Sequence, residues 1–230
     1  MKHESIMEPT TTGASVGYVN DKQSKMLIVH PVKRAVDIFI ALAALVFLAP
    51  VLLVTYAAVK LTSKGPGIFV QERCGLAGEM FNCYKFRSME IDAAARLAKI
   101  LAEDPEAARE WRSTHKLRND PRVTPIGYFL RKSSIDELPQ LINILRGDMS
   151  IVGPRPIVLD ERMRYGRHIA SYNRVRPGVV GLWQISGRSN VSYNDRVSLD
   201  VEYVDTWSLK NDLMIFLKAI PAVLFARGAY

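Results

Sequence analysis

The stretch AVDIFIALAALVFLAPVLLVTYAAV, residues 35–59, decides how the chain can fold. No charged residue occurs between Ile38 and Val59, and this length is about what a helix needs to span a bilayer. Hydropathy alone therefore predicts one transmembrane helix. Pro50 lies near the middle, where it removes a backbone hydrogen-bond donor and clashes with the preceding turn, so a kink is expected there.

Basic residues flank both ends of this helix and favour a different topology. They are Lys22, Lys25, Lys33 and Arg34 before it, and Lys60, Lys64 and Arg73 after it. The positive-inside rule places both flanks in the cytoplasm, which a spanning helix cannot satisfy. Prolines do occur in genuine spanning helices. A helix over residues 31–62, bent at Ala49-Pro50 and entering and leaving by the same leaflet, satisfies both flanks, and we predict such a re-entrant helix.

The composition limits the remaining choices. The chain has 230 residues, 48% of them hydrophobic, and a net charge of +8, which indicates an anionic partner such as nucleic acid, a membrane surface or a phosphorylated substrate. Lysines and arginines are scattered, which argues against nucleic acid. Cys74 and Cys83 are interpreted as reduced thiols, with a cross-strand disulfide as the alternative. Residues 1–30 are polar and are predicted to be a disordered tail, not a secretory signal.

The rest of the chain, residues 63–230, is predicted to be a small, mostly helical α+β catalytic domain on the cytosolic side. Residues 67–89 contain strand-like pieces around a glycine-containing turn and predict a β-hairpin. Helices are expected over residues 91–113 with a break at Pro105, over 136–147 and over 193–207. Residues 208–227 form an amphipathic segment that lies either in the membrane interface or in the core.

Two adjacent acids, Asp136 and Glu137, occur in SSIDELPQLINILRGDMSIVGPRP, residues 133–156. Ser134 and Glu137 fit a helix capping box, which is the structural interpretation. Pro139 disfavours it, because the amide at that position would need to donate a hydrogen bond. A helix that begins at Asp136 or Glu137 instead places both acids at the positive end of its dipole, which favours their ionised forms. One carboxylate can then attack phosphorus while its neighbour holds a divalent metal.

Phosphate chemistry also needs cations around the non-bridging oxygens. The candidates are Arg131, Arg155 in GPRP, Lys85 and Arg87 in YKFRSM, and Arg188 in SGRS. Any one of them taken alone is more often a solvated surface charge.

Several motifs together resemble a known family. They are KRAVDIFIALAALVFLAPVLL, YKFRSM, RKSSIDELPQLINILRGDMSIVGPRP, RPGVVGLWQISGR and LDVEYV, in order from about Lys33 to the C-terminus. The chain resembles the bacterial sugar transferases that are monotopic polyprenyl-phosphate phosphoglycosyl transferases. Within that family it is most similar to the small enzymes that start exopolysaccharide repeat units with galactose-1-phosphate or glucose-1-phosphate.

The resemblance implies a mechanism and its residues. Asp136 would attack the β-phosphate of a UDP-hexose, release UMP and hold the sugar phosphate covalently until undecaprenyl phosphate accepts it. Glu137 would bind Mg²⁺. The other matching positions are Arg131, Arg155 and Arg188 around the phosphates and nucleotide, Lys85 and Asp200 near the site, and Lys33, Arg34 and Asp37 at the foot of the re-entrant helix. The family often has Ser-Pro at the bend, where this chain has Ala49-Pro50.

The resemblance also implies the setting of the reaction. The expected location is the bacterial inner membrane, with the catalytic domain on its cytoplasmic face. Inner-leaflet lipids and a second copy of the chain are expected partners, nucleic acid is not, and galactose is the favoured hexose. Two alternatives remain open: a membrane-anchored glycosyltransferase that releases UDP, and a non-enzymatic, basic, membrane-tethered binding module.

Overall fold

The computed structural model describes residues 27–114, 117, 119–186 and 192–224. Most of the predicted N-terminal tail, the candidate Arg188 and the last residues of the predicted C-terminal segment lie outside the described residues. The described part is mostly helical, with two small two-stranded sheets.

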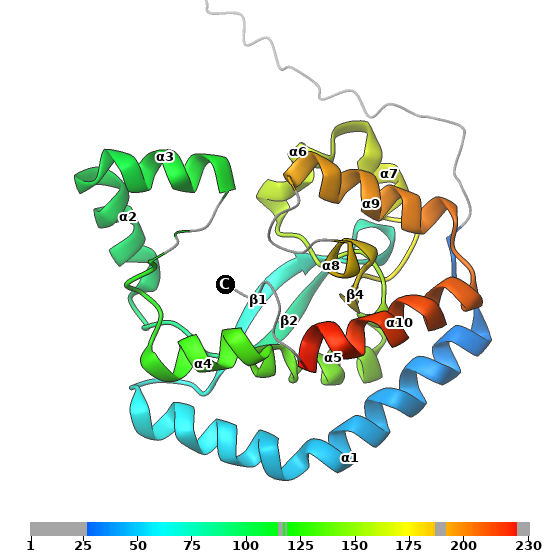
Figure 1. Cartoon of the computed structure of the whole chain (residues 1–230), viewed down its shortest axis with the longest axis horizontal. Coiled ribbons are helices and arrows are strands. Elements are labelled where there is room, and N and C mark those ends of the chain that lie inside the picture. Colours follow the sequence, from blue (N-terminus) through cyan, green and yellow to red (C-terminus); the bar gives the residue numbers. More distant parts are fainter. Residues whose placement is uncertain (1–26, 115–116, 118, 187–191, 225–230) are drawn as a thin grey trace, which may run out of the picture.

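The apolar stretch forms one helix, α1 (Pro31–Thr62), with Pro31 at its start and Pro50 inside it. This confirms the predicted long helix, and Figure 1 shows its axis bending between the blue and cyan halves, the part that contains Pro50. Asp37 and Ala41 near one end and Thr55 and Val59 near the other are buried against the domain. Both halves of α1 therefore pack against the same side of the molecule.

The predicted hairpin is confirmed. Strands β1 (Ile68–Cys74) and β2 (Met80–Phe86) pair antiparallel, with Gln71 opposite Cys83 and Cys74 opposite Met80. A single 3-10 turn, η1 (Leu76–Gly78), connects them, and Gly78 adopts a positive φ of 80° there. Both cysteines are free, as predicted, and both are buried.

Two helices follow the hairpin and project from the body of the molecule (Figure 1), α2 (Ala93–Glu103) and α3 (Pro105–Thr114). Their boundary confirms the break predicted at Pro105. The next helix, α4 (Pro125–Ser133), was not predicted, although Thr124 is a regular N-cap that accepts a hydrogen bond from the Gly127 amide.

The acidic stretch folds differently from the prediction. Ser134 ends α4 in the left-handed conformation, residues Ile135–Glu137 form the 3-10 turn η2, and α5 (Gln140–Arg146) begins only after Pro139. Ser134 makes no side-chain cap, so the capping box is absent, and a helix start at Asp136 or Glu137 is wrong as well. The left-handed Ser134 ends α4, and the acids lie in the short segment that connects α4 to α5.

A second sheet was missed from the sequence. Strands β3 (Ser150–Val152) and β4 (Gly178–Val180) pair in parallel, and three residues are too few to show an alternating pattern. Gly178 allows their close approach, since a Cβ there would lie 2.1 Å from the Gly153 nitrogen.

Short helices complete the domain. They are η3 (Leu159–Glu161), α6 (Arg162–Tyr165), η4 (Gly166–His168), α7 (Ile169–Tyr172) and α8 (Leu182–Ile185), followed by α9 (Tyr193–Asp205) and α10 (Leu209–Leu224). The main core joins α1, α5, β3, α9 and α10 through residues such as Ala41, Ile144, Val152, Val204 and Ile215. The helix predicted over 193–207 is thus confirmed as α9, and the described part of the amphipathic segment 208–227 is the helix α10.

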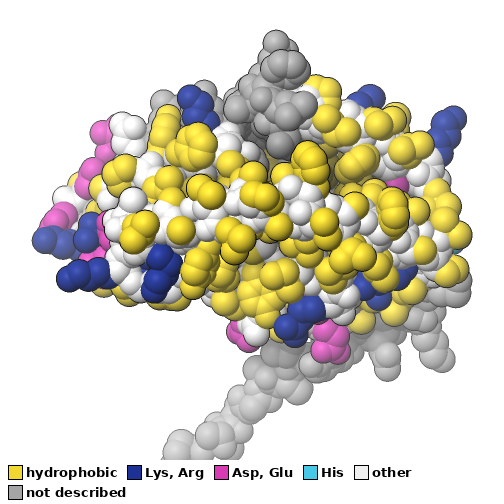
Figure 2. Space-filling view, turned by 90° about the horizontal axis from the view of Figure 1, so that it is seen from below, with side chains coloured by type: hydrophobic (Ala, Val, Ile, Leu, Met, Phe, Trp, Pro, Cys, Tyr) yellow, Lys and Arg dark blue, Asp and Glu magenta, His cyan; other side chains and the backbone are white. Residues whose placement is uncertain are grey.

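One face of the molecule is apolar. Figure 2, seen from below, shows hydrophobic side chains across the face that α1 occupies, with lysines and arginines mainly around its border. Large exposed apolar side chains of α1 include Phe39, Val46, Phe47, Leu53 and Val54, and those of α10 include Leu213 and Leu217. An exposed apolar face of this extent marks a surface that contacts another apolar phase.

Candidate active site

The two acids lie against the β-hairpin. Lys85 on β2 donates to Glu137 Oε1 at 2.5 Å, and this ion pair holds η2 beside the strand. Asp136 is 9% exposed, whereas Glu137 remains partly accessible beside it. The neighbouring Ile135 packs with Val59, Phe86 and Leu130. The acids are therefore next in sequence to a residue of the apolar contact between α1 and the domain.

Asn143 fixes the distance between the acids and β2. It is fully buried on α5, and its side-chain amide accepts from the Tyr84 amide at 3.0 Å and donates to the Asn82 carbonyl at 2.7 Å. Asn143 thus satisfies backbone groups of the two residues that flank Cys83 on the free edge of β2. Lys85 follows two residues after Cys83 on the same strand. Sequence reasoning missed this role, since a buried asparagine in a helix has no distinctive sequence pattern.

The two carboxylates have opposite protonation tendencies. Burial, with the adjacent charge of Glu137, raises the pKa of Asp136 to about 6, against the opposing effect of Lys85 and Arg131. Burial would raise the pKa of Glu137 as well, but Lys85 foremost, with Arg155 and Arg73, holds that pKa below its usual value. The acids do not lie at the helix terminus that was expected to favour their ionised forms. Neighbouring cations favour the ionised form of Glu137 instead, and a pKa of about 6 leaves Asp136 mostly ionised at neutral pH.

Arg131 and Arg155 also reach this region. Arg131 lies in the last turn of α4, donates from Nε to Ser88 Oγ at 2.9 Å and favours the ionised form of Asp136. Arg155 is partly buried in the loop after β3, and its charge acts on Glu137. Within the described residues its guanidinium has no hydrogen bond or ion pair, and its recorded contact is the Trp183 ring at 6.0 Å. Arg155 is therefore available to bind an anion.

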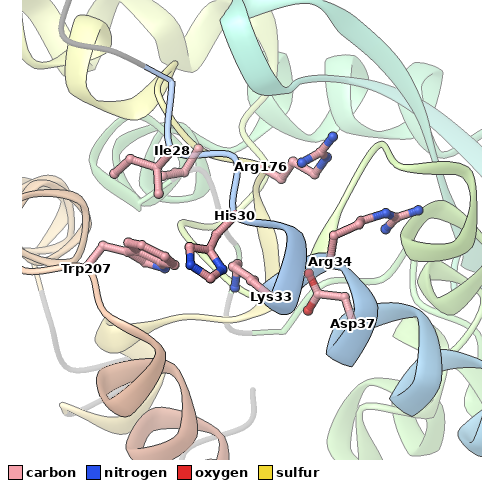
Figure 3. A pocket seen from close by; sticks show the side chains of 8 residues that line it. Ile28, His30, Lys33, Arg34, Asp37, Arg176 and Trp207 are labelled. Carbon is pink, nitrogen blue, oxygen red and sulfur yellow. The ribbon is translucent and has the colours of Figure 1, made fainter.

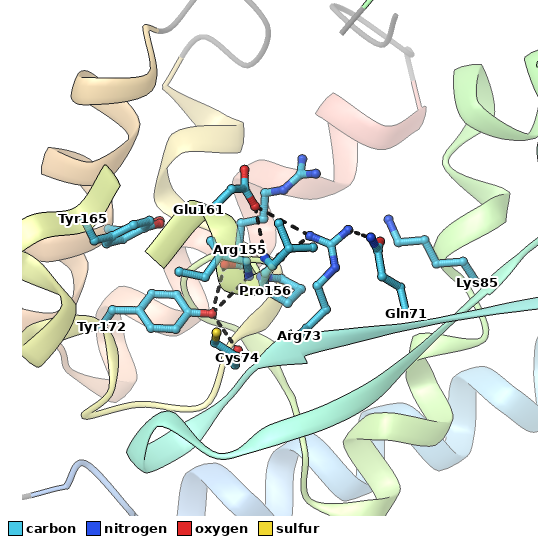
Figure 4. Close-up of polar contacts among 12 residues, drawn as sticks. Gln71, Arg73, Cys74, Lys85, Arg155, Pro156, Glu161, Tyr165 and Tyr172 are labelled. Carbon is cyan, nitrogen blue, oxygen red and sulfur yellow. Dashed lines mark hydrogen bonds and ion pairs between the residues drawn. The ribbon is translucent and has the colours of Figure 1, made fainter. Parts of the chain in front are cut away.

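A further cation was not predicted at this site. Arg73 on β1 lies on the same face of the hairpin as Lys85, because directly opposed residues of an antiparallel pair share a face and Phe69 opposes Lys85. Figure 4 shows Gln71, Arg73 and Lys85 extending from the hairpin toward Arg155 and Glu161. The i, i+2 spacing of Gln71 and Arg73 in a predicted strand was the signal that could have found it.

Arg87 lies elsewhere than predicted. It is buried, and its guanidinium donates to the Lys64 carbonyl at 2.5 Å and to the Ser63 carbonyl and hydroxyl at 2.9 and 2.6 Å. These acceptors follow the C-terminal end of α1. The structure thus gives Arg87 the role of fixing that end of the helix, and within the described residues no hydrogen bond or ion pair joins it to Asp136 or Glu137.

The three residues at the foot of α1 bind the protein interior. Lys33 contacts Asp212 Oδ2 at 2.7 Å and the Val152 carbonyl at 2.9 Å, and Arg34 donates to the Ile144 and Leu145 carbonyls. Asp37 accepts from the Ser150 hydroxyl and the Ile151 amide. Figure 3 shows Lys33, Arg34 and Asp37 around a small cavity with His30 and Trp207, and neither Asp136 nor Glu137 lines it. These residues tie α1 to β3, α5 and α10.

Asp200 is a buried acid on α9, and among the residues that the structure describes no hydrogen bond or ion pair joins it to Asp136 or Glu137. Its Oδ2 accepts from the Tyr165 hydroxyl at 2.7 Å, and its buried Oδ1 has no hydrogen-bond partner within that part of the chain. Burial raises its pKa to about 7.

The acids suit a metal ion that arrives with its substrate. Among the described residues no three His, Cys, Asp or Glu side chains gather as a preformed metal site. Mg²⁺ commonly takes one or two carboxylates together with substrate phosphates and water. Glu137 is ionised and partly accessible beside Asp136, and this donor set fits such an ion.

The chain is similar to known proteins over most of its length. Residues 28–226 match the family described as "Bacterial sugar transferase". The chain is 50% identical over 198 residues to the exopolysaccharide production protein ExoY of Sinorhizobium fredii, a match that covers 86% of this chain and 88% of that protein.

Two further relatives are longer proteins. An uncharacterized sugar transferase of Haemophilus influenzae is 50% identical over 86% of this chain and 42% of its own length. The undecaprenyl-phosphate galactose phosphotransferase of Salmonella typhimurium is 47% identical over 86% of this chain and 41% of its own length. The chain thus spans less than half of these two relatives. With a family match over nearly all of the described residues, the chain belongs to the bacterial sugar transferase family.

Proposed function

We propose that this enzyme transfers hexose-1-phosphate from a UDP-hexose to undecaprenyl phosphate, as the first membrane step of exopolysaccharide synthesis. Galactose-1-phosphate is the group we expect, in line with the name of the Salmonella relative. The observation that carries the proposal is the pair Asp136–Glu137. Glu137 is paired with Lys85, whereas Asp136 is buried near Arg131 and has no ion pair among the described residues.

The chemistry proceeds in two displacements at one phosphorus atom. A carboxylate oxygen of Asp136 attacks the β-phosphorus, the bond from that phosphorus to the bridging oxygen breaks, and UMP leaves with the electron pair. The hexosyl phosphate is then esterified to Asp136. An oxygen of undecaprenyl phosphate attacks the same phosphorus, and Asp136 leaves as a carboxylate.

The neighbouring residues neutralise charge during both displacements. The free guanidinium of Arg155 suits the non-bridging phosphate oxygens in a bidentate manner, and Arg131 offsets the charge at Asp136. Mg²⁺ held by Glu137 would supply further neutralisation of the diphosphate. Lys85 keeps Glu137 ionised and therefore ready to bind that ion.

We also propose that α1 is re-entrant and places the site at the cytoplasmic face of the inner membrane. Lys33 at one end and Ser63 just past the other both bind residues of the same domain. A straight spanning helix of 32 residues would separate its ends by about 48 Å, across a hydrocarbon core of about 30 Å. One domain cannot hold both ends on opposite sides of that core. The apolar face in Figure 2 supports contact with lipid, with the α10 side chains lying in the same interface.

A product assay tests the reaction. The purified enzyme in nanodiscs with undecaprenyl phosphate is incubated with a panel of UDP-hexoses, and UMP and UDP are quantified. UMP release with one hexose is expected, whereas UDP release would show a glycosyltransferase instead, and lipid binding without turnover would favour the binding module. Intact-protein mass spectrometry without lipid acceptor is expected to show one hexosyl phosphate on the native chain and none on Asp136→Asn. The exposed Asp160→Asn is the matched control.

Cysteine labelling tests the topology. Val29 and Leu61 are exposed residues at the two ends of α1, and the native cysteines are buried. Val29→Cys and Leu61→Cys are expected to react with a membrane-impermeant maleimide in inverted vesicles and not in intact spheroplasts. Labelling of the two positions from opposite sides would show that α1 spans the membrane.

A further inference from the structure

The loop that carries Arg155 is fixed along its backbone by neighbouring elements. On one side, two backbone hydrogen bonds extend the β3–β4 sheet into the loop: the Gly153 amide donates to the Val180 carbonyl, and the Gly178 amide donates to the Pro154 carbonyl. On its second side the Cys74 amide of β1 donates to the Ile157 carbonyl at 2.8 Å. Two side chains complete these contacts.

Arg73 is the first of these side chains. It is 9% exposed, and its Nη1 donates to the Pro156 carbonyl at 3.0 Å while its Nη2 donates to Gln71 Oε1 at 2.6 Å. Glu161, just after the loop, lies 3.8 Å from Nη1. Arg73 and Cys74, adjacent on β1, thus bind the adjacent carbonyls of Pro156 and Ile157.

Tyr172 on α7 is the second. Its ring is 2% exposed, and its hydroxyl accepts from the Ile157 amide at 3.3 Å. The same hydroxyl lies 2.9 Å from the Cys74 carbonyl and 3.2 Å from the Arg155 carbonyl, and its single proton serves one of them at a time. Figure 4 shows this hydroxyl directed into the space between Cys74 and the Arg155–Pro156 backbone.

The contrast between the backbone and side chain of Arg155 gives these contacts a function. Its backbone is held by buried groups on two sides, while its guanidinium has no hydrogen bond or ion pair within the part of the chain described here. Such an arrangement preorganises a charged hydrogen-bond donor before the ligand binds and leaves that donor free to contact the ligand. We infer that Arg73 and Tyr172 are positioning residues, which together hold Arg155 where it meets the diphosphate of the sugar nucleotide.

This inference rests on the proposed function, since it needs Arg155 to bind that diphosphate. A double-mutant cycle tests it. The dissociation constant of UDP is measured by calorimetry in nanodiscs, with Mg²⁺, for Tyr172→Phe and Arg73→Lys in the native chain and in Arg155→Ala. The Lys variant keeps the charge of Arg73 but loses its forked geometry. Because the readout is UDP binding, the cycle does not depend on residual turnover.

The expected result is a fivefold or greater weakening of UDP binding by each substitution in the native chain and less than twofold in Arg155→Ala. A purely structural role would weaken binding equally in both backgrounds, and that result would overturn the inference while leaving the proposed function intact. If Arg155→Ala alone left UDP binding unchanged, the role of Arg155 would be refuted, and the positioning role of Arg73 and Tyr172 would be refuted with it. The lipid-transfer assay would still test the proposed reaction independently.

A matched control separates positioning from general loss of a buried hydroxyl. Tyr203 is also 2% exposed, and its hydroxyl bonds the Val152 carbonyl and Asp212, away from the Arg155 backbone. Tyr203→Phe is expected to show the same proportional effect in the native and Arg155→Ala chains. Circular dichroism and thermal unfolding of all variants verify that each is folded under the assay conditions.

Discussion

The Lys85 amine lies 2.5 Å from the Glu137 carboxylate, although 52 residues separate them in the chain. The pair joins the strand β2 to the turn η2, and it is the contact that gives the two acids their different environments. Glu137 is stabilised as an anion, and that anion in turn makes ionisation of Asp136 harder. The strongest prediction about the site follows from this pair.

Lys85→Met is expected to lower the rate of transfer about a hundredfold, a typical cost of removing one preorganised electrostatic contact. The reason is that the pKa of Glu137 rises when its principal cation is lost, and less of it is ionised to bind Mg²⁺. UMP release measured against Mg²⁺ concentration checks this, with a higher Mg²⁺ requirement in the variant. Lys85→Arg, which keeps the charge, is the control, and an unaltered Mg²⁺ dependence in Lys85→Met would contradict the prediction.

The first half-reaction is expected to depend on pH through Asp136. A nucleophile must be ionised, and burial raises the pKa of Asp136 to about 6. The rate of UMP release therefore rises between pH 5 and pH 7 and is constant above that range. Single-turnover measurements without lipid acceptor are the appropriate readout, because the lipid phosphate itself titrates at about pH 6. A rate that is flat down to about pH 4 would show an unperturbed nucleophile.

Asp136→Asn is expected to abolish transfer and to stabilise the fold above pH 6. The pKa of this acid is higher in the folded chain than in the unfolded chain, so the native protein loses stability as pH rises from about 4 to about 6. Asparagine removes that loss, which amounts to about 1–3 kcal/mol at pH 7.5. Thermal unfolding at pH 7.5 and pH 4 checks this: the variant should be more stable at the higher pH only. A lower unfolding temperature at pH 7.5 would show that Asp136 stabilises the fold.

Lys33→Met is expected to destabilise the protein by about 3 kcal/mol, because it leaves the buried Asp212 without its cation. Asp212 would still accept from the Tyr203 hydroxyl and the Trp207 ring nitrogen, but those neutral donors do not offset its charge. Denaturant unfolding in detergent measures the loss. Lys60→Met, which removes an exposed lysine from the other end of α1, should change stability by less than about 0.5 kcal/mol. Equal effects at both ends would rule out the buried pair as the cause.

Gly178→Ala is expected to destabilise the protein by about 1–3 kcal/mol and to weaken UDP binding. The added Cβ would lie 2.1 Å from the Gly153 nitrogen and 2.6 Å from the Val152 carbonyl carbon, so β3 and β4 must separate and the loop of Arg155 must move. Gly166→Ala is the control, because that glycine has a positive φ of 48° but nothing within 4 Å. It should reduce stability through backbone strain and leave UDP binding unchanged. A loss of binding by Gly166→Ala alone would contradict the assignment.

Local signals in the sequence were enough to predict much of the fold. The hairpin, the break at Pro105 and the long apolar helix follow from alternation, from proline and from an uninterrupted run of apolar residues. The strands β3 and β4 could not be predicted, because each has three residues and their pairing joins segments 28 residues apart. The start of α5 was misplaced because Ser134 adopts a left-handed conformation that a serine seldom takes.

The candidate site was predicted in part. Asp136, Glu137, Lys85, Arg131 and Arg155 are brought near one another as expected from the motifs. Arg87 lies two residues after Lys85, so strand alternation would place both on one face, but β2 ends at Phe86 and the Arg87 guanidinium binds Ser63 after the end of α1. Arg73 and Asn143 act through contacts with distant backbone groups, and such contacts have no local signature.

The sequence by itself determined which chemistry is at hand: an acidic pair, nearby cations and an apolar helix interrupted by proline, each fixed by residue type and spacing. The tertiary structure alone decided the state of that chemistry. The pKa values of Asp136 and Glu137 diverge because burial dominates at Asp136, whereas Glu137 forms an ion pair with Lys85. The two ends of α1 lie on one domain because Lys33 and Ser63 both bind residues of that domain. Burial and electrostatic interaction depend on distances between groups far apart in the chain, and only folding sets those distances.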